Sequence, residues 1–402
     1  MRRRVRLLVA AALVLVASAC TWPQFKFGAS REGSNPFEVT INSANVAGLN
    51  LAWSRSTGLA TAPNDPVVAG RNAFFTVGDT LDSIIALDTA DGSTRWSAPL
   101  PQAAPGFGVR GTPPVADGSR ILVGLDQDVG VSGSHGGVAA YDADTGRFLA
   151  EEEEDFRARG GLAASVNGQL YQSFHVFLRT GETFDGVHGP GFDVLSTTGT
   201  PAVRAGVLYV RSTAFTSSTC GSSPQWPIPV CSPTWSGTAG DTVPAVTATT
   251  LYVGDDDGHL YAFPSDGCGG STCAPLWSGS TGGAVKSSPA VGGGVVAVGS
   301  DDGKVYAFPD GGCGQATCAP LWTASLGAPV ATAPAIANGL VFVTATDGRL
   351  AAFTLGGCGQ PTCAPLWTTD VPAQPGAPTV ASGRVIVSAA NGNIYAYGLA
   401  SH

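Results

Sequence analysis

The sequence has few charged residues and no long apolar run. Charged residues make up 13% of the 402 positions, the formal net charge is −9, and basic residues cluster only at the N-terminus. A protein that binds nucleic acid needs a basic surface to neutralise the phosphates, so the composition argues against a nucleic-acid partner. The longest apolar run, residues 7–19, is too short for a helix that spans a bilayer.

Glycine and proline, in contrast, are abundant. The chain has 55 Gly and 28 Pro. These residues interrupt long helices and mark the turns between short strands. The composition therefore predicts an all-β chain, and its length is sufficient to bury a large core.

The first 20 residues have the features of a signal peptide. A basic start, MRRRVR, precedes the apolar run, and small residues close that run. The segment ASAC at 17–20 resembles a bacterial lipobox, with Ala17 at the position where that motif prefers leucine. Two outcomes stay open: lipidation of Cys20 after cleavage before it, or ordinary cleavage that leaves a periplasmic or secreted protein. Residues 21–48 are then an extended N-terminal segment.

Nine cysteines in an exported chain predict disulfide bonds and one cysteine left over. Three pairs share a C-x4-C spacing that recurs every 45 residues, and a fourth pair lies in one proline-rich loop. The predicted pairs are Cys268 with Cys273, Cys313 with Cys318, Cys358 with Cys363, and Cys220 with Cys231. Zinc is the alternative for the first three, but it needs four ligands at one site. Cys20 has no partner, which favours lipidation over a free thiol.

A related unit repeats through the chain. In the copies SPAVGGGVVAVGSDDGKVYAF and APAIANGLVFVTATDGRLAAF, a proline and an apolar pair precede two alternating strands joined by Asp-Gly. Asp-Gly or Asn-Gly between such strands is a strong hairpin signal. Eight copies predict an eight-bladed β-propeller of four-stranded antiparallel blades over residues 49–398, with 399–402 as a tail.

Tryptophans mark the fourth strand of the units and predict how the ring closes. Trp53, in the segment NLAWS, lies directly before the first repeat, whereas the last repeat ends without a tryptophan. We therefore expect the strand Leu51–Ser54 to complete the last blade, because ring closure removes free sheet edges. An open solenoid is the alternative, but it would need polar caps at its ends. The structural tryptophans are Trp53, Trp96, Trp235, Trp277, Trp322 and Trp367.

Two segments resemble the tryptophan-docking motif of quinoprotein-like eight-bladed propellers, A-x-D-x-x-T-G-x-x-x-W. The segments are ALDTADGSTRW at 86–96 and AYDADTGRFLA at 140–150. The matching residues are Ala86, Asp88, Gly92, Trp96, Ala140, Asp142, Thr145 and Gly146. The resemblance implies the propeller fold. It also implies two kinds of function: enzymes of the family hold pyrroloquinoline quinone and calcium at the ring centre, whereas exported lipoproteins of the family are interaction scaffolds.

The strand order predicts which loops share a face of the ring. In a four-stranded meander, the connections 1–2 and 3–4 lie on one face and the connections 2–3 and 4–1 on the other. The cysteine loops, between strands 3 and 4, therefore lie opposite the Asp-Gly turns. Insertions concentrate in blades 2–4, and long loops on a rigid scaffold are typical binding sites. The candidate binding residues there are His135, His175, Asp185, His188, Asp193 and Trp226, for which metal binding is the less favoured alternative.

The sequence favours a non-catalytic scaffold at the cell envelope. It has no recognisable nucleophile motif with a histidine partner and no adjacent cysteine pair of the kind that quinoprotein enzymes often carry. We expect no cofactor, a monomer, and a protein, peptide or envelope component as the partner, with a membrane contact through Cys20. The alternative is an alcohol dehydrogenase that uses pyrroloquinoline quinone and calcium. The fold alone does not decide between them.

Overall fold

The protein is described by a computed structural model. The described residues are 21, 23, 26–59, 61–78, 83–101, 109–128, 134–154, 163–164, 169–173, 177–183, 192–195, 200–223 and 226–400. They are mainly short strands, with single 3-10 turns at η1 (Val46–Gly48) and η3 (Ser217–Thr219). None of the helical segments in these ranges is long and apolar enough to cross a membrane.

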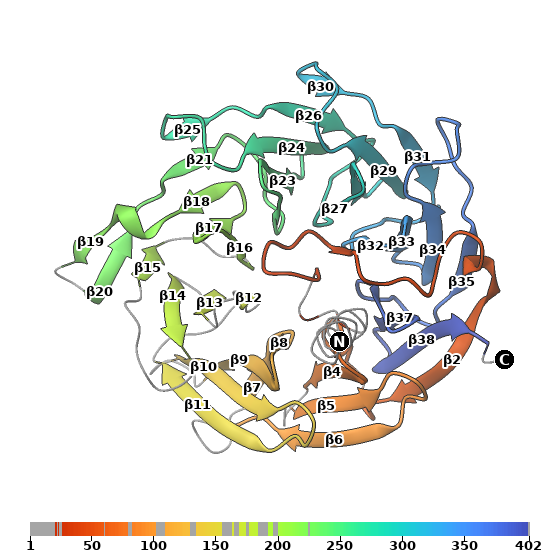
Figure 1. The fold of residues 1–402 in the computed structure, drawn as a ribbon, viewed down its shortest axis with the longest axis horizontal. Helices are drawn as coiled ribbons and strands as arrows, with labels where there is room; N and C mark the ends of the chain where they lie inside the picture. The colour runs from red at the N-terminus through yellow and green to blue at the C-terminus, as the bar shows by residue number, and fades with distance from the viewer. Residues whose placement is uncertain are drawn as a thin grey trace, which may run out of the picture.

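The described strands form eight sheets that follow one another around a ring (Figure 1). In each sheet the first strand is nearest the ring centre and the fourth is at the rim. The all-β propeller predicted from the sequence is confirmed. Blade 1 contains β3 (Val67–Ala69), β4 (Asn72–Val77), β5 (Ser83–Asp88) and β6 (Thr94–Pro99), and blade 2 contains β7 (Val109–Gly111), β8 (Val115–Asp117), β9 (Arg120–Asp128), β10 (Ser134–Asp142) and β11 (Phe148–Glu154). Blade 3 contains β12 (Ala163–Ala164), β13 (Gln169–Ser173), β14 (Phe177–Thr183) and β15 (Phe192–Leu195), and blade 4 contains β16 (Ala202–Arg204), β17 (Val207–Val210), β18 (Thr213–Phe215) and β21 (Trp235–Gly237).

The second half of the ring is more regular. Blade 5 contains β22 (Ala245–Val246), β23 (Thr250–Gly254), β24 (His259–Pro264) and β26 (Trp277–Ser280), and blade 6 contains β27 (Ala290–Gly292), β28 (Val295–Gly299), β29 (Lys304–Pro309) and β31 (Trp322–Ser325). Blade 7 contains β32 (Ala335–Ala337), β33 (Leu340–Thr344), β34 (Arg349–Thr354) and β35 (Trp367–Asp370), and blade 8 contains β36 (Thr379–Ala381), β37 (Arg384–Ser388), β38 (Asn393–Leu399) and β2 (Leu49–Ser56). The remaining strands are β1 (Ser34–Asn35), β19 (Cys220–Ser223), β20 (Trp226–Cys231), β25 (Thr272–Cys273) and β30 (Thr317–Cys318).

The ring closes as the position of Trp53 predicts. Strand β2, from the N-terminal part of the chain, pairs antiparallel with the C-terminal strand β38, from Leu49 opposite Leu399 to Ser56 opposite Asn393. The last blade therefore has the order β2-β38-β37-β36. The closed ring is observed and the open solenoid is not.

The blades stack face to face, which explains the uninterrupted apolar second strands. All five residues of β23, β28 and β33 are buried. A strand that is covered on both faces needs apolar side chains on both, so the usual alternation of apolar and polar residues is lost. The core is accordingly a series of layers between blades, such as the cluster that joins the last blade to its neighbours and includes Phe75, Phe342 and Ile386.

The three predicted C-x4-C disulfides are present, and their loops pack on the neighbouring blade. The bonds join Cys268 to Cys273, Cys313 to Cys318, and Cys358 to Cys363. Loop strand β25 of blade 5 pairs in parallel with β21, the rim strand of blade 4, and β30 of blade 6 pairs with β26 of blade 5. A parallel bridge between Thr323 and Thr362 repeats the arrangement one blade later. Each loop thus covers the open edge of the preceding blade, the kind of edge that otherwise recruits other chains.

The proline-rich loop of blade 4 follows the same rule. Its hairpin of β19 and β20 places Cys220 directly opposite Cys231, and Cys231 is disulfide-bonded. Strand β20 then pairs in parallel with β15, the rim strand of blade 3. All four cysteine-bearing connections therefore extend the sheet of the blade before them.

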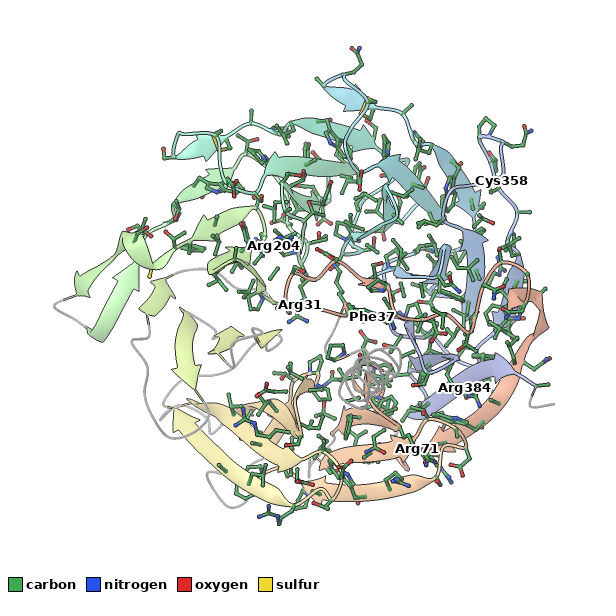
Figure 2. All side chains as sticks on the ribbon, in the orientation of Figure 1. Arg31, Phe37, Arg71, Arg204, Cys358 and Arg384 are labelled. Carbon is green, nitrogen blue, oxygen red and sulfur yellow. A yellow bond between two sulfur atoms is a disulfide. The ribbon has the colours of Figure 1, made fainter. Side chains whose placement is uncertain are left out.

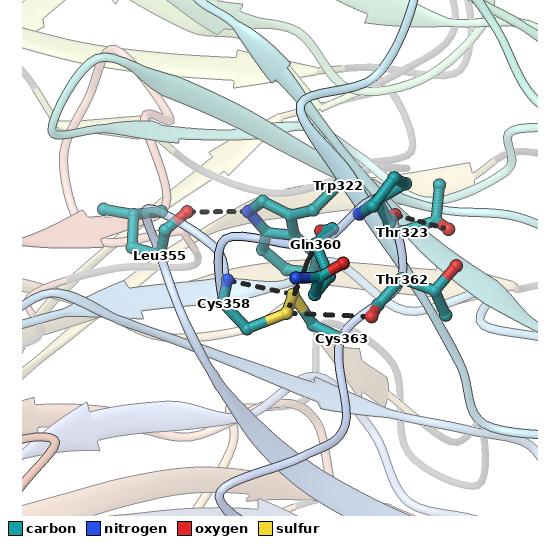
Figure 3. Close-up of a disulfide and its surroundings, with 8 residues drawn as sticks. Trp322, Thr323, Leu355, Cys358, Gln360, Thr362 and Cys363 are labelled. Atoms are coloured by element: carbon teal, nitrogen blue, oxygen red, sulfur yellow. Dashed lines mark hydrogen bonds between the residues drawn. A yellow bond between two sulfur atoms is a disulfide. The ribbon is translucent and has the colours of Figure 1, made fainter.

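The rim tryptophans dock on the connection between the third and fourth strands of the next blade. The Nε1 group of Trp322 donates to the carbonyl of Leu355 in the next blade at 2.9 Å, beside the Cys358–Cys363 bond (Figure 3). The Nε1 groups of Trp96 and Trp53 donate likewise to Ala143 and Thr89. A glycine with positive φ lies against most of these indoles, because a Cβ atom there would overlap the ring. The glycines are Gly92, Gly146, Gly267, Gly312 and Gly357.

We predict that Gly312→Ala destabilises the ring more than Gly314→Ala. Both glycines lie in one loop at φ 75°, so each substitution costs about 1–2 kcal/mol for the left-handed backbone. A Cβ on Gly312 would also lie 2.6 Å from Cδ1 of Trp277, whereas nothing lies within 4 Å of one on Gly314. Displacement of the indole should add about 1–3 kcal/mol. Denaturant unfolding of both variants measures the difference, and equal losses would contradict indole docking.

Candidate functional site: the ring centre and its N-terminal segment

The N-terminal segment lies inside the ring. Residues 23 and 26–35, which we call the inner belt, run along the innermost strands and appear in red at the ring centre in Figure 1. Five inner strands donate a backbone N–H to a belt carbonyl, always from the second residue after the proline of their repeat. The pairs are Ala116 to Pro23 at 2.7 Å, Val203 to Ala29 at 2.7 Å, Val246 to Ser30 at 2.8 Å, Val291 to Glu32 at 2.6 Å and Ile336 to Gly33 at 2.8 Å.

The belt therefore provides a hydrogen-bond acceptor for a backbone N–H group at the inner edge of blades 2 and 4–7. At blade 7 it becomes strand β1, which pairs in parallel with β32 and places Ser34 opposite Ile336. Unpaired N–H groups at a buried strand edge are costly. The belt supplies a partner for one N–H group in each of these five blades, and only at blade 7 does it form a strand of its own.

Asn35 ends the belt and joins it to blade 8. Its side chain is fully buried. The Nδ2 group donates to the carbonyls of Val380 at 2.9 Å and Thr21 at 3.2 Å. The Oδ1 atom accepts from the N–H groups of Phe37 and Glu38. One amide thus fixes the belt to a sixth blade and to the first described residue of the chain.

Two buried cations belong to the belt. Arg31 is 0% exposed and its Nε donates to the carbonyl of Pro201 at 3.1 Å; burial lowers its pKa to about 9. Lys26 is 2% exposed, and its Nζ atom has no hydrogen-bond partner among the described residues. Burial, and then the charge of Arg31, hold the pKa of Lys26 well below its usual value. Figure 2 shows Arg31 at the ring centre.

The belt backbone is strained near these cations. Lys26, Phe27 and Arg31 have φ values of 59°, 72° and 57°, in a region that side chains other than glycine rarely adopt. Glu32, the neighbouring acid, forms an ion pair with Arg204 of blade 4 at 3.1 Å, and burial raises its pKa. Strained residues persist only where surrounding contacts hold them, and here the five inner-strand bonds do so.

None of the binding residues predicted from the sequence belongs to the belt. Cys20, His175, Asp185 and His188 fall outside the described residues. The strands of Asp193 and Trp226 are neighbours, because β15 pairs with β20. His135 lies in another sheet, opposite Gln127 on β9. In the described part of the chain, no three His, Cys, Asp or Glu side chains group where they could hold a metal ion.

The comparisons with known proteins identify the family. A family model described as outer membrane protein assembly factor BamB matches residues 48–267 and 270–357. The chain belongs to this family. No curated protein matches it.

Solved structures resemble the chain in fold. The computationally designed protein Ika8 has a TM-score of 0.61 at 15% identity and covers 85% of this chain and 98% of its own. Quinohemoprotein alcohol dehydrogenase from Comamonas testosteroni has a TM-score of 0.66 at 12% identity, over 97% of this chain and 82% of its own. BamB from Moraxella catarrhalis has a TM-score of 0.44 at 15% identity, over 88% and 98%.

The residues described at the ring centre do not fit a quinone and calcium pair. Calcium takes carboxylate, carbonyl and amide oxygens, whereas the belt brings two buried cationic side chains there, Lys26 and Arg31. The inner-strand N–H groups of five blades already bind belt carbonyls. In this member of the BamB family, the belt lies along the inner strands, in the part of the ring where the quinoprotein resemblance implies a cofactor.

Sequence reasoning missed the belt altogether. The side chains that fix it are polar or charged, Arg31, Asn35 and Glu38, and these are buried, as is Lys26. Such residue types in a segment without periodicity are typical of an exposed linker. The only local signal is Asn35-Pro36, which indicates a turn but not its place in the fold.

We predict that Asn35→Asp destabilises the protein by about 2–4 kcal/mol at neutral pH. The change replaces an N–H donor with a carboxylate that faces the carbonyls of Thr21 and Val380, and an unpaired buried charge is costly. Acidification should recover part of the loss, because a protonated carboxyl can donate again. Asn50→Asp is the control, since Asn50 is exposed and bonds only locally. Equal unfolding free energies for both variants would contradict the role of Asn35.

We also predict that Lys26→Met stabilises the protein by about 1–3 kcal/mol at pH 7, because it removes a buried amine that has no hydrogen-bond partner in the described part of the chain. The folded pKa of Lys26 lies below its unfolded value, so wild-type stability falls as pH drops from about 10.4 through the folded pKa. The gain from the variant should therefore shrink toward pH 10. Lys304→Met, at an exposed site, should change stability by less than about 0.5 kcal/mol. Chemical unfolding across this pH range measures both.

Proposed function

We propose that this chain is an exported envelope protein, anchored by a lipid on Cys20, that binds protein partners as a monomeric, non-catalytic scaffold. Membership of the BamB family supports an envelope role, since the family is named for an outer membrane protein assembly factor. The single observation that carries the scaffold assignment is the inner belt, which occupies the ring centre with the chain's own backbone. The surfaces left for partners are the two faces of the ring and the insertions of blades 2–4.

The alternative, a dehydrogenase with pyrroloquinoline quinone and calcium, has less support. The likeness to the Comamonas testosteroni enzyme is one of fold at 12% identity. A quinone in the middle of the ring would have to displace a segment held by five backbone hydrogen bonds and the Asn35 side chain. The described residues offer no group of three potential metal ligands for calcium.

The test of the proposal combines an anchor measurement with a partner measurement. We expect the intact mass of the exported chain to include a diacylglyceryl group that Cys20→Ala abolishes. We also expect photo-crosslinkers at positions 188 and 226 to capture the same envelope protein, and a crosslinker at Asp256, an exposed turn residue of blade 5, to capture none.

Two results would overturn the proposal. One is an exported chain without an acyl group whose crosslinked products do not depend on the position of the crosslinker. The other is saturable binding of pyrroloquinoline quinone with calcium, followed by absorbance and by a raised unfolding midpoint, since this would require the belt to leave the ring centre.

A further inference from the structure

The rim strands differ in whether a neighbouring loop pairs with their outer edge. In blades 4–6, the residue after the rim tryptophan donates its backbone N–H to a carbonyl of the next cysteine loop. These bonds join Ser236 to Ser271 at 2.9 Å, Ser278 to Ala316 at 2.8 Å and Thr323 to Pro361 at 2.9 Å. The N–H of Cys363 donates back to the carbonyl of Thr323 at 2.9 Å. One extended loop segment thus pairs with both backbone groups of that rim residue, as in a parallel ladder.

The rim strands of blades 8 and 1, β2 and β6, have no such loop partner in the described part of the chain. Their register matches that of a covered strand: in β2, β6 and β31 alike, the tryptophan lies opposite an alanine of the third strand. The residues after it, Ser54 and Ser97, therefore point their N–H groups outward, as Thr323 does. Both are exposed, and neither donates to a backbone acceptor outside its own sheet within the described ranges.

The cause is the length of the connection in the following blade. Between strands 3 and 4 of blade 1, the chain takes 10 residues from position 86 to the tryptophan at 96, against 15 from 262 to 277 in blade 5. The short turns of blades 1 and 2 accept the Nε1 groups of Trp53 and Trp96, but they add no strand beside β2 or β6. Figure 1 shows β2 and β6 outermost in neighbouring blades, whereas β25 and β30 lie outside β21 and β26.

Strand β2 offers the longer of the two open edges. It has eight residues, of which six are exposed. It contains neither lysine nor proline, two residues that natural proteins often place on free edges. Its one charged side chain, Arg55, donates from Nε to the carbonyl of Gly92 at 2.8 Å. A register shift between Leu51 and Trp53 interrupts the strand, so residues 53–56 form its regular part.

The covered edges show what such an edge accepts. In the loops of blades 5 and 6, the segment that pairs with the rim consists of an exposed threonine and a buried cysteine. Cys273 and Cys318 are 0% and 2% exposed, and they belong to core clusters that include the rim tryptophans Trp235 and Trp277. The matching occupant of an open edge is an extended segment with polar side chains outward and small apolar side chains toward the ring.

We infer that β2 and β6 bind an extended segment of a partner polypeptide in parallel, by the backbone pairing that the cysteine loops make with β21, β26 and β31. Strand addition of this kind takes its affinity from main-chain hydrogen bonds and its specificity from alternate side chains. The rim of blades 8 and 1 thus adds a third surface for partners to the faces and insertions of the ring. The inference depends neither on the lipid anchor nor on the insertions of blades 2–4.

The test measures site-resolved amide exchange in the exported full chain with Cys20→Ala. The probe is a peptide of alternating threonine and valine with a lysine at each end. Without peptide, the N–H groups of Ser54 and Ser97 should exchange fast and that of Thr323 slowly. Saturating peptide should slow exchange at Ser54 and Ser97 and leave Thr323 unchanged. The same peptide methylated on every backbone nitrogen should change none of them.

Two results would overturn the inference. One is exchange at Ser54 and Ser97 that the probe peptide slows no more than the methylated peptide does. The other is slow exchange at both residues that depends on the concentration of the protein alone, because a second copy of the chain would then occupy the edges. Crosslinking at positions 188 and 226 reports on the insertions and the intact mass reports on the lipid. Failure of the proposed scaffold role and failure of the open edges therefore give different results.

Matched proline variants give a second measurement. Proline has no N–H group and is tolerated on a free strand edge. Ser54→Pro together with Ser97→Pro should leave the urea midpoint of unfolding near that of the wild type. The pair should weaken peptide binding about five- to tenfold, which corresponds to one lost hydrogen bond at each edge. Thr323→Pro removes the bond to the carbonyl of Pro361, so it should lower the midpoint and leave peptide binding unchanged.

Equal peptide affinity in the wild type and the double proline variant would contradict strand addition, as would an equal loss of affinity in Thr323→Pro. The exchange experiment needs no substitution, so it decides the question even where a proline variant fails to fold.

Discussion

Every blade of this ring has an inner and an outer strand edge, and the hydrogen-bonding groups of both edges need partners. The outer edges of blades 3–6 are paired by the disulfide loop of the following blade. The inner edges of blades 2 and 4–7 donate to the belt. A free strand edge can pair with other chains. These two sets of contacts therefore keep the short sheets within one ring.

The same edge contacts limit where function can lie. The belt uses backbone groups of the ring centre for structure, which leaves the faces and the insertions for recognition. The disulfide loops carry half-exposed leucines into one face as a consequence of covering the rim. The loops that close the outer edges thereby also place apolar side chains on the face of the 3–4 connections.

The sequence predicts the parts of this fold that rest on repetition. The 45-residue spacing of the C-x4-C pairs, the Asp-Gly turns and the displaced Trp53 lead to a closed propeller, and the pairing of β2 with β38 agrees. The sequence does not reveal that the cysteine loops cover the rim strand of the preceding blade. A local disulfide restricts the shape of its own loop but does not indicate which strand that loop contacts. The belt is invisible for a different reason: Lys26, Arg31 and Asn35 are buried against the usual tendency of their residue types, and only long-range contacts explain it. The predicted binding sites in blades 2–4 rest on composition and loop length, neither of which shows how the side chains are arranged in space.

The N-terminal part of the chain contacts both the inner strands and an outer edge of the ring. The belt bonds the inner strands of blades 2 and 4–8, and β2 forms the outer strand of blade 8 beside β38, the last strand to be synthesised. The ring can therefore close only when the whole chain is present, and the contacts that close it have the longest sequence separations in the molecule. The entropy of closing such long loops is lost before the hydrogen bonds that offset it can form, so closure is a late step in folding.

In an exported chain, the belt and β2 reach the far side of the membrane first. Their backbone and the charged side chains of Lys26 and Arg31 stay solvated there until the final blade arrives. The polar composition of the segment keeps it solvated before the ring closes. In the finished ring, the belt carbonyls at the inner strands exchange hydrogen bonds to water for hydrogen bonds to backbone N–H groups of the blades.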